Sequence, residues 1–206
     1  MDGVTTILVS GFTQQLGRVN GILRLRETLV EDGFNCGPRW RTYYVEWRAD
    51  FAQLASDVAN CAVIHRVRPR VNLCGYSYGG WGALRLAEEL EARGIEVPVL
   101  TLVDPVARAP WVPRPIPTPS SMLPRYWSRL LLVPANVGMV HEFYQRTNRP
   151  QGHRLVLSPS TQIGSSTELD LRHDQMDDAA VVHECVIEAA RGLKAIATAS
   201  EREDGT

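Results

Sequence analysis

The stretch that most constrains the fold of this chain is residues 75–80, GYSYGG, which places the pattern G-x-S-x-G around Ser77. A short apolar run at 71–74 precedes it, and apolar residues at helical spacing follow it from Trp81. A strand that turns sharply into a helix at a serine requires small neighbours, because a Cβ there would collide with the adjoining strand or helix. The pattern therefore predicts a tight strand–turn–helix unit whose serine hydroxyl stands clear of a sheet edge.

Strand and helix patterns alternate along the rest of the chain. Short runs rich in apolar and aromatic residues predict strands at 5–10, 43–47, 71–74, 99–103 and 154–157. Apolar residues at helical spacing predict helices at 22–32, 51–68, 81–93, 136–146 and 178–198. This alternation predicts an α/β three-layer sandwich, with a mostly parallel sheet of about five to six strands and helices on both faces. No internal repeat is visible, and we expect residues 1–206 to form one domain.

Length, charge and cysteine content set the broad class of protein. A chain of 206 residues suits one domain, and its net charge of −1 gives no reason to expect a nucleic acid as partner. The N-terminus lacks the pattern of a signal peptide and no run approaches the length of a membrane span, so we expect a cytoplasmic protein. None of the four cysteines has metal-ligand spacing, and we expect neither a metal nor another cofactor.

A serine hydroxyl acts as a nucleophile only when a base accepts its proton and a third group orients that base. Parallel-sheet sites gather at the carboxyl ends of strands, and His173 lies between the last predicted strand and the last predicted helix. We therefore expect His173 to be the base for Ser77. The remaining histidines lie on predicted helices or at the other end of the last predicted strand: His65, His141, His153 and His183.

The acidic partner of His173 is harder to choose. Asp104 directly follows the predicted strand at 99–103, and we expect it to be the acid. Glu168, Asp170 and Asp174 are alternatives, although Asp174 adjoins His173 and neighbouring side chains on an extended loop usually point apart. Residues 177–178 are typical of the first turn of the last helix.

An oxyanion hole needs two donors aimed at the negative charge that develops on the reacting carbonyl. The Tyr78 amide directly follows the serine and can supply one donor. We expect the second from the loop after the first strand, where Gly11 allows close approach and the Phe12 amide is our choice. Thr13 or Gln14 could add a side-chain contact to the substrate.

These pieces together resemble the α/β-hydrolase family. The matching segments are ILVSGF, VNLCGYSYGG, VLTLVDP and LRHDQMDD, which occur in the family's order and cover nearly the whole chain. The resemblance implies a two-step acyl transfer, in which Ser77 attacks an ester-type carbonyl, His173 serves as base and then acid, and Asp104 holds the imidazole.

The chain also departs from the pattern of that family. It begins at what corresponds to the family's third strand, so we expect a sheet without the antiparallel first strands. Ser10 stands where many members have a histidine, and the acid more often follows the next strand along, so the resemblance leaves Asp104 open. There is no room for a large helical cap domain.

A proline-rich segment follows the candidate acid. Eight of the thirteen prolines lie between Pro105 and Pro134, which excludes a continuous helix or a central strand. We expect a lip or insert at about 105–135 beside the site, or else a surface crossover with its aromatic side chains in the core. The side chains that could line an acyl pocket there are Trp111, Ile116, Met122, Leu123, Tyr126 and Trp127.

The function that fits these features is hydrolysis of a small-molecule carboxylic ester through a serine nucleophile. An acyl thioesterase is the nearest alternative, because the same three residues serve both reactions. A non-catalytic binding protein on the same fold is the other alternative, but a binding scaffold has no need for a strained serine turn. The pattern at 75–80 lacks the Lys-Ser/Thr of a phosphate-binding loop.

Overall fold

The computed structural model of the chain describes residues 1–12, 14, 19–108 and 130–204. The helices among these residues are α1 (Gly21–Glu31), α2 (Phe51–His65), α3 (Tyr78–Glu91), the short 3₁₀ helix η3 (His173–Asp178) and α4 (Ala180–Asp204). The strands are β1 (Asp2–Ser10), β2 (Trp40–Glu46), β3 (Arg68–Tyr76), β4 (Glu96–Val103), β5 (Leu131–Leu132), β6 (Val137–Tyr144), β7 (Leu155–Val156) and β8 (Gln162–Glu168).

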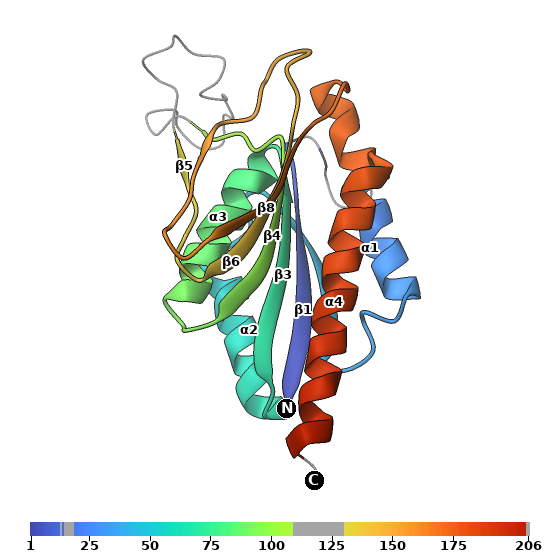
Figure 1. Cartoon of the computed structure of the whole chain (residues 1–206), viewed down its shortest axis with the longest axis vertical. Helices are drawn as coiled ribbons and strands as arrows, with labels where there is room; N and C mark the ends of the chain where they lie inside the picture. Colours follow the sequence, from blue (N-terminus) through green and yellow to red (C-terminus); the bar gives the residue numbers. More distant parts are fainter. Residues whose placement is uncertain (13, 15–18, 109–129, 205–206) are drawn as a thin grey trace.

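The described strands form one large sheet and one small one. The large sheet has six strands in the order β2-β1-β3-β4-β6-β8, and each neighbouring pair in it is parallel. Helices α1 and α4 cover one face, and α2 and α3 cover the other (Figure 1). The prediction of a three-layer α/β sandwich with a mostly parallel sheet is confirmed.

The central strands are apolar on both sides because both of their faces are covered. Consecutive residues of β1 show this: Ile7 and Val9 pack with α2 and α3, while Leu8 between them packs with α1 and α4. Ile7 pairs with Leu73 of β3, which pairs with Leu100 of β4, so three fully buried side chains cross the sheet in one row. This row anchors the strand that leads into Ser77.

The segment predicted as a helix at 136–146 is the strand β6, so that prediction was wrong and His141 lies on a strand. The buried residues Val137, Val140 and Phe143 recur every three positions, which suits a helix. In the sheet, however, Val140 faces the α2–α3 side and Phe143 faces the α4 side. Where β6 pairs with β8, the register shifts between Val140 and His141.

The end of the chain also differs from expectation. The strand predicted at 154–157 is the two-residue β7, which pairs with β5 in the small sheet. The last strand of the large sheet is β8, in a segment where we predicted only a loop; most of its residues are exposed, as expected of an edge strand. Helix α4 begins at Ala180 and continues to Asp204, past the predicted end at 198.

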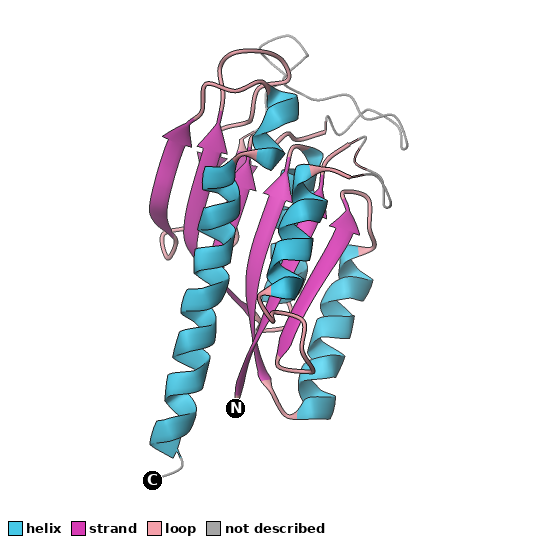
Figure 2. Ribbon diagram, turned by 90° about the vertical axis from the view of Figure 1, so that its right-hand side faces the viewer, coloured by secondary structure: helices cyan, strands magenta, loops and turns pink. Residues whose placement is uncertain are grey.

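The parallel arrangement brings the carboxyl ends of the large sheet's strands to one edge of the molecule. Figure 2 shows the strand arrowheads pointing toward that edge, away from both chain termini. Gly11, Ser77, Asp104 and Gln145 each directly follow one of these strands, and His173 lies in the connection after β8. No helix in the described part of the chain has the length and apolar character that crossing a membrane requires.

Candidate active site

Ser77 occupies the sharp turn between β3 and α3. Its φ of 54° is positive, a backbone conformation that a non-glycine residue rarely adopts. The turn is tight because α3 starts directly against β1: a Cβ on Gly79 would lie 2.1 Å from the carbonyl oxygen of Val9. A Cβ on Gly75 would lie 2.4 Å from the Gly79 carbonyl oxygen. The glycines of the motif are thus required by close backbone approach.

His173 lies between Ser77 and Asp104. Its Nε2 is 2.8 Å from Ser77 Oγ, and its Nδ1 is 2.5 Å from Asp104 Oδ2. A carboxylate only accepts hydrogen bonds, so Nδ1 carries the proton and the Nε2 of a neutral ring is free to accept from the serine hydroxyl. The three side chains therefore form one hydrogen-bonded series from Ser77 through both imidazole nitrogens to Asp104.

Asp104 directly follows β4 with a φ of 44° and is fully buried. Its Oδ1 accepts a hydrogen bond from the Gly152 amide at 2.7 Å, and its Oδ2 accepts one from Gln145 Nε2 at 3.0 Å as well as the one from His173. These donors satisfy a carboxylate that would otherwise be costly to bury. They also fix the orientation of the carboxylate toward the imidazole.

Further contacts hold the main chain of His173 and the face of its ring, in addition to the hydrogen bonds of its ring nitrogens. Its amide donates to Asn148 Oδ1 at 2.8 Å, and its carbonyl accepts from the Tyr76 hydroxyl at 2.7 Å. The Tyr76 ring also lies against the imidazole, with centroids 5.3 Å apart. Burial raises the pKa of Tyr76, which keeps its hydroxyl a proton donor. The residue before the serine thus positions the histidine.

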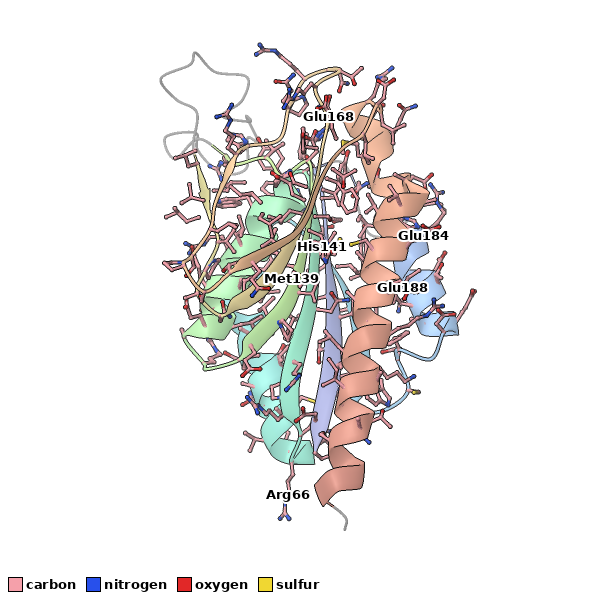
Figure 3. The ribbon with its side chains drawn as sticks, in the orientation of Figure 1. Arg66, Met139, His141, Glu168, Glu184 and Glu188 are labelled. Carbon is pink, nitrogen blue, oxygen red and sulfur yellow. The ribbon has the colours of Figure 1, made fainter. Side chains whose placement is uncertain are left out.

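The other acids considered from the sequence are exposed, and two of them pair with arginines. Glu168 is at the carboxyl end of β8 (Figure 3) and pairs with Arg146 at 3.5 Å. Asp174 pairs with Arg172 at 3.1 Å, and Asp170 is exposed. Figure 3 also shows His141 part-way along β6, below the edge where Glu168 lies.

The candidate oxyanion donors come from both sides of Ser77. Tyr78 is the first residue of α3, where backbone amides have no partner within the helix. Across from it, a Cβ on Gly11 would lie 3.1 Å from Ser77 Cβ, so the loop after β1 passes directly beside the serine. The Phe12 ring contacts the Tyr78 ring edge-on, with centroids 6.2 Å apart. The Gly11 amide itself donates to Gln14 Oε1 at 3.0 Å.

Residues 7–194 match the sequence profile of the alpha/beta hydrolase family. This chain belongs to that family. The resemblance noted from the sequence is therefore confirmed, and the protein is a hydrolase of the alpha/beta superfamily. A comparison with curated proteins gives no match.

Solved structures similar to this hydrolase come from several bacteria. A protein described as an alpha/beta-superfamily hydrolase, from Xanthomonas campestris pv. campestris, is 13% identical with a TM-score of 0.47, over 91% of this chain and 98% of that one. The RedJ thioesterase of prodiginine biosynthesis in Streptomyces coelicolor is 12% identical with a TM-score of 0.45, over 92% and 85%. Est1E from Butyrivibrio proteoclasticus is 12% identical with a TM-score of 0.44, over 94% and 89%. The family assignment rests on the sequence profile.

A cavity of about 510 Å³ lies on the α2–α3 side of this hydrolase. Trp47, Phe51 and Trp81 contribute its aromatic wall. Charged side chains also line it: Arg48, Asp50, Arg85, Glu89 and Arg108. The Trp47 ring also packs on the Tyr78 ring, with centroids 5.3 Å apart, so the cavity adjoins the residue next to Ser77. The other side chains that we predicted to contact the substrate or line an acyl pocket lie outside the described part of the chain: Thr13, Trp111, Ile116, Met122, Leu123, Tyr126 and Trp127.

Several residues that build this site were not predicted from the sequence. Gln145, Asn148 and Gly152 all belong to the connection after β6, which no motif marks. Asp177 was assigned to the start of the last helix, but it is buried within η3, and its carboxylate contacts Gln14 and Gly21 instead. Among the described residues, no cluster of three or more histidine, cysteine or acidic side chains could hold a metal ion.

Proposed function

We propose that this hydrolase cleaves carboxylic esters of small molecules, with Ser77 as nucleophile, His173 as general base and acid, and Asp104 as the residue that orients the imidazole. The observation that carries the proposal is the continuous hydrogen-bonded series from Ser77 Oγ through both imidazole nitrogens to the buried Asp104 carboxylate. Such a series is what activation of a serine hydroxyl requires.

The reaction would proceed in two halves. Ser77 Oγ attacks the ester carbonyl carbon while its proton passes to His173 Nε2, and the tetrahedral intermediate expels the alcohol as the imidazolium returns that proton to the leaving oxygen. Water, deprotonated by His173, then attacks the acyl carbon. The bond to Oγ breaks, the acid leaves, and Ser77 regains its proton.

The Phe12 and Tyr78 amides would donate to the carbonyl oxygen as it becomes negative. Gly11 supports this role because it lets the loop approach Ser77 closely. The cavity beside Trp47 and Trp81 offers an apolar wall for one part of the substrate. In this proposal residues 1–206 act as one domain, and the lip at about 105–135 remains a prediction.

The Ser77→Ala substitution tests the nucleophile. Turnover of 4-nitrophenyl butyrate should fall by a factor on the order of a million, while the melting temperature should stay close to that of the wild type. Ser160→Ala, which removes a serine hydroxyl from an exposed loop, is the matched control. Ester cleavage that survives in Ser77→Ala would place the nucleophile elsewhere.

A fluorophosphonate probe gives an independent test that needs no knowledge of the substrate. It should form a covalent adduct on Ser77 in the folded wild-type protein and leave Ser77→Ala unlabelled. A folded protein that takes no label would overturn the enzymatic function itself. Rates on butyryl esters and matched butyryl thioesters then decide whether the hydrolase prefers an oxygen ester or a thioester.

A further inference from the structure

A glutamine side chain ties the loop after β1 to the segment that carries His173. Gln14 Oε1 accepts the Gly11 amide at 3.0 Å, and Gln14 Nε2 donates to Asp177 Oδ2 at 2.5 Å. The main chain closes the same turn, because the Gln14 amide donates to the Gly11 carbonyl at 3.3 Å and Ser10 Oγ donates to the Gln14 carbonyl at 3.2 Å. One side chain thus connects two segments that are far apart in sequence.

Asp177 also holds the start of α1 at the same carboxylate oxygen that accepts from Gln14. It is only 4% exposed, and its Oδ2 also accepts the Gly21 amide, at the start of α1, at 2.8 Å. The first amides of a helix have no partner within the helix and favour a negative charge. A Cβ on Gly21 would lie 2.1 Å from the Asp177 carbonyl oxygen, so α1 begins directly against η3. The turn, α1 and η3 are therefore held at one carboxylate oxygen.

The environment of this carboxylate leaves Gln14 little freedom to move. Burial raises the pKa of Asp177, and the hydrogen bonds from Gly21 and Gln14 oppose that shift. A buried carboxylate that loses a donor is strongly destabilised, so the side-chain amide group of Gln14 is constrained to stay in contact with it.

The turn held in this way lies directly beside the reacting atoms. Gly11 sits against Ser77 and against the Tyr76 ring, which a Cβ on Gly11 would approach to 2.9 Å. Because the Gly11 amide is engaged by Gln14, the Phe12 amide is the donor of this turn that the proposed mechanism uses. Asp177 lies in the same short helix that begins with His173. The base and the oxyanion turn are therefore both positioned from η3.

We propose that Gln14 and Asp177 are positioning residues, which form a bridge that sets the Phe12 amide at a fixed place relative to His173 and Ser77. The inference rests on the proposed function, since it assigns these residues a role in that reaction. Neither residue touches the reacting atoms, and both act through the turn that Gln14 closes onto Gly11.

Gln14→Met tests the bridge, because it keeps the side-chain length and removes both hydrogen bonds. It should lower kcat by roughly ten- to a hundredfold, which is less than the loss of an oxyanion donor. KM should stay nearly unchanged, because the hydrogen bond from the Phe12 amide to the substrate's carbonyl oxygen strengthens in the transition state. The affinity for phenylboronic acid, which forms a tetrahedral adduct on a serine, should fall by a similar factor. A purely structural role would instead change the melting temperature without lowering kcat and boronate affinity at an unchanged KM.

Asp177 provides the second half of the test. Asp177→Ala should lower kcat as Gln14→Met does, and the double variant should lose no more than the worse single variant, because both remove one bridge. Asp177→Asn keeps a carbonyl oxygen that can accept from Gly21 and Gln14, so it should retain most of the activity. If Asp177→Ala fails to fold, Gln14→Met and Asp177→Asn still decide the question.

The control is Gln53→Met, which makes the same substitution on the exposed surface of α2, where Gln53 contacts Asp57. The proposed role of the bridge would be overturned if Gln14→Met kept the kcat and boronate affinity of the wild type. Fully additive losses in the double variant would also overturn it. Failure of the proposed function is a separate result, since wild-type protein would then show no Ser77-dependent hydrolysis at all.

Discussion

Asp104 is surrounded by hydrogen-bond donors on both carboxylate oxygens, and this makes its replacement by asparagine informative. An asparagine would turn its NH₂ group either toward the Gly152 amide or toward the donors on Gln145 and His173. Asp104→Asn should therefore favour the wrong imidazole tautomer and lower kcat on the order of ten-thousandfold. The measurement is steady-state hydrolysis of 4-nitrophenyl butyrate.

The matched control for this substitution is Asp170→Asn, which neutralises an exposed carboxylate in the same loop as His173. It should leave kcat close to that of the wild type. The opposite pattern, with activity lost in Asp170→Asn and kept in Asp104→Asn, would show that the acid has been assigned to the wrong residue.

Residue by residue, the sequence could predict the members of the candidate site that follow an apolar run. Ser77 and Asp104 directly follow strands that could be recognised, and His173 could be placed because it precedes the last helix. Gln145 and Gly152 could not be found in this way, because their contacts with Asp104 depend on how the connection after β6 folds back. Asp177 has the residue type of a helix start, and only the three-dimensional structure shows its carboxylate contacting α1.

Among the elements, the start of α3 packs so closely on β1 that it tolerates little change. A Cβ on Gly79 would meet the carbonyl oxygens of Val9 and Ser10 at 2.1 and 2.6 Å, and backbone atoms of a central strand cannot move aside cheaply. Gly79→Ala should therefore destabilise the fold by about 1–3 kcal/mol or more and distort the Ser77 turn. Urea unfolding and ester hydrolysis measure the two effects.

Gly192 in α4 supplies the control, since it is also a helical glycine but a Cβ there would meet no atom within 4 Å. Gly192→Ala should stabilise the protein by about 0.5–1 kcal/mol through its better helix propensity. Equal effects of the two substitutions would mean that the close approach of α3 to β1 does not limit the fold.

The local sequence pattern of each element explains which elements could be predicted. Helix α2, with its helical apolar spacing, and strand β1, with its continuous apolar run, were predicted because their local pattern agrees with their place in the fold. Strand β6 was taken for a helix because its buried residues recur every three positions while lying on both faces of the sheet. Strand β8 is an edge strand with mostly exposed residues, so it shows no apolar pattern.

At the scale of the whole molecule, the buried His153 and the half-buried His141 link stability to pH. His153 is 6% exposed, and its Nδ1 accepts a hydrogen bond from the Ala107 amide at 3.2 Å, which requires an unprotonated nitrogen. Burial lowers the pKa of His153, and a hydrogen bond with the Pro105 backbone and the Asp104 charge oppose that shift only partly. Burial lowers the pKa of His141 as well. Both histidines therefore resist protonation in the folded state more than in the unfolded chain.

Acidification should consequently destabilise the fold. Below the ordinary histidine pKa of about 6.5, the unfolded chain binds a proton that folded His153 does not, so the free energy of unfolding falls as the pH is lowered, by at most about 1.4 kcal/mol per pH unit for each histidine. The raised pKa of Asp177 has the opposite sign, but a carboxyl group normally titrates at lower pH. Urea unfolding at about pH 7.5 and about pH 5.5 should reveal the histidine effect.

His153→Asn isolates the contribution of this one imidazole. The asparagine carbonyl can accept from the Ala107 amide and does not titrate, so the loss of stability between the two pH values should become smaller than in the wild type. His141 continues to act in the variant, so the loss should shrink without vanishing. His65→Asn, which makes the same change at the exposed end of α2, is the matched control. An unchanged loss in His153→Asn would mean that protonation of this buried ring is not what makes the fold sensitive to acid.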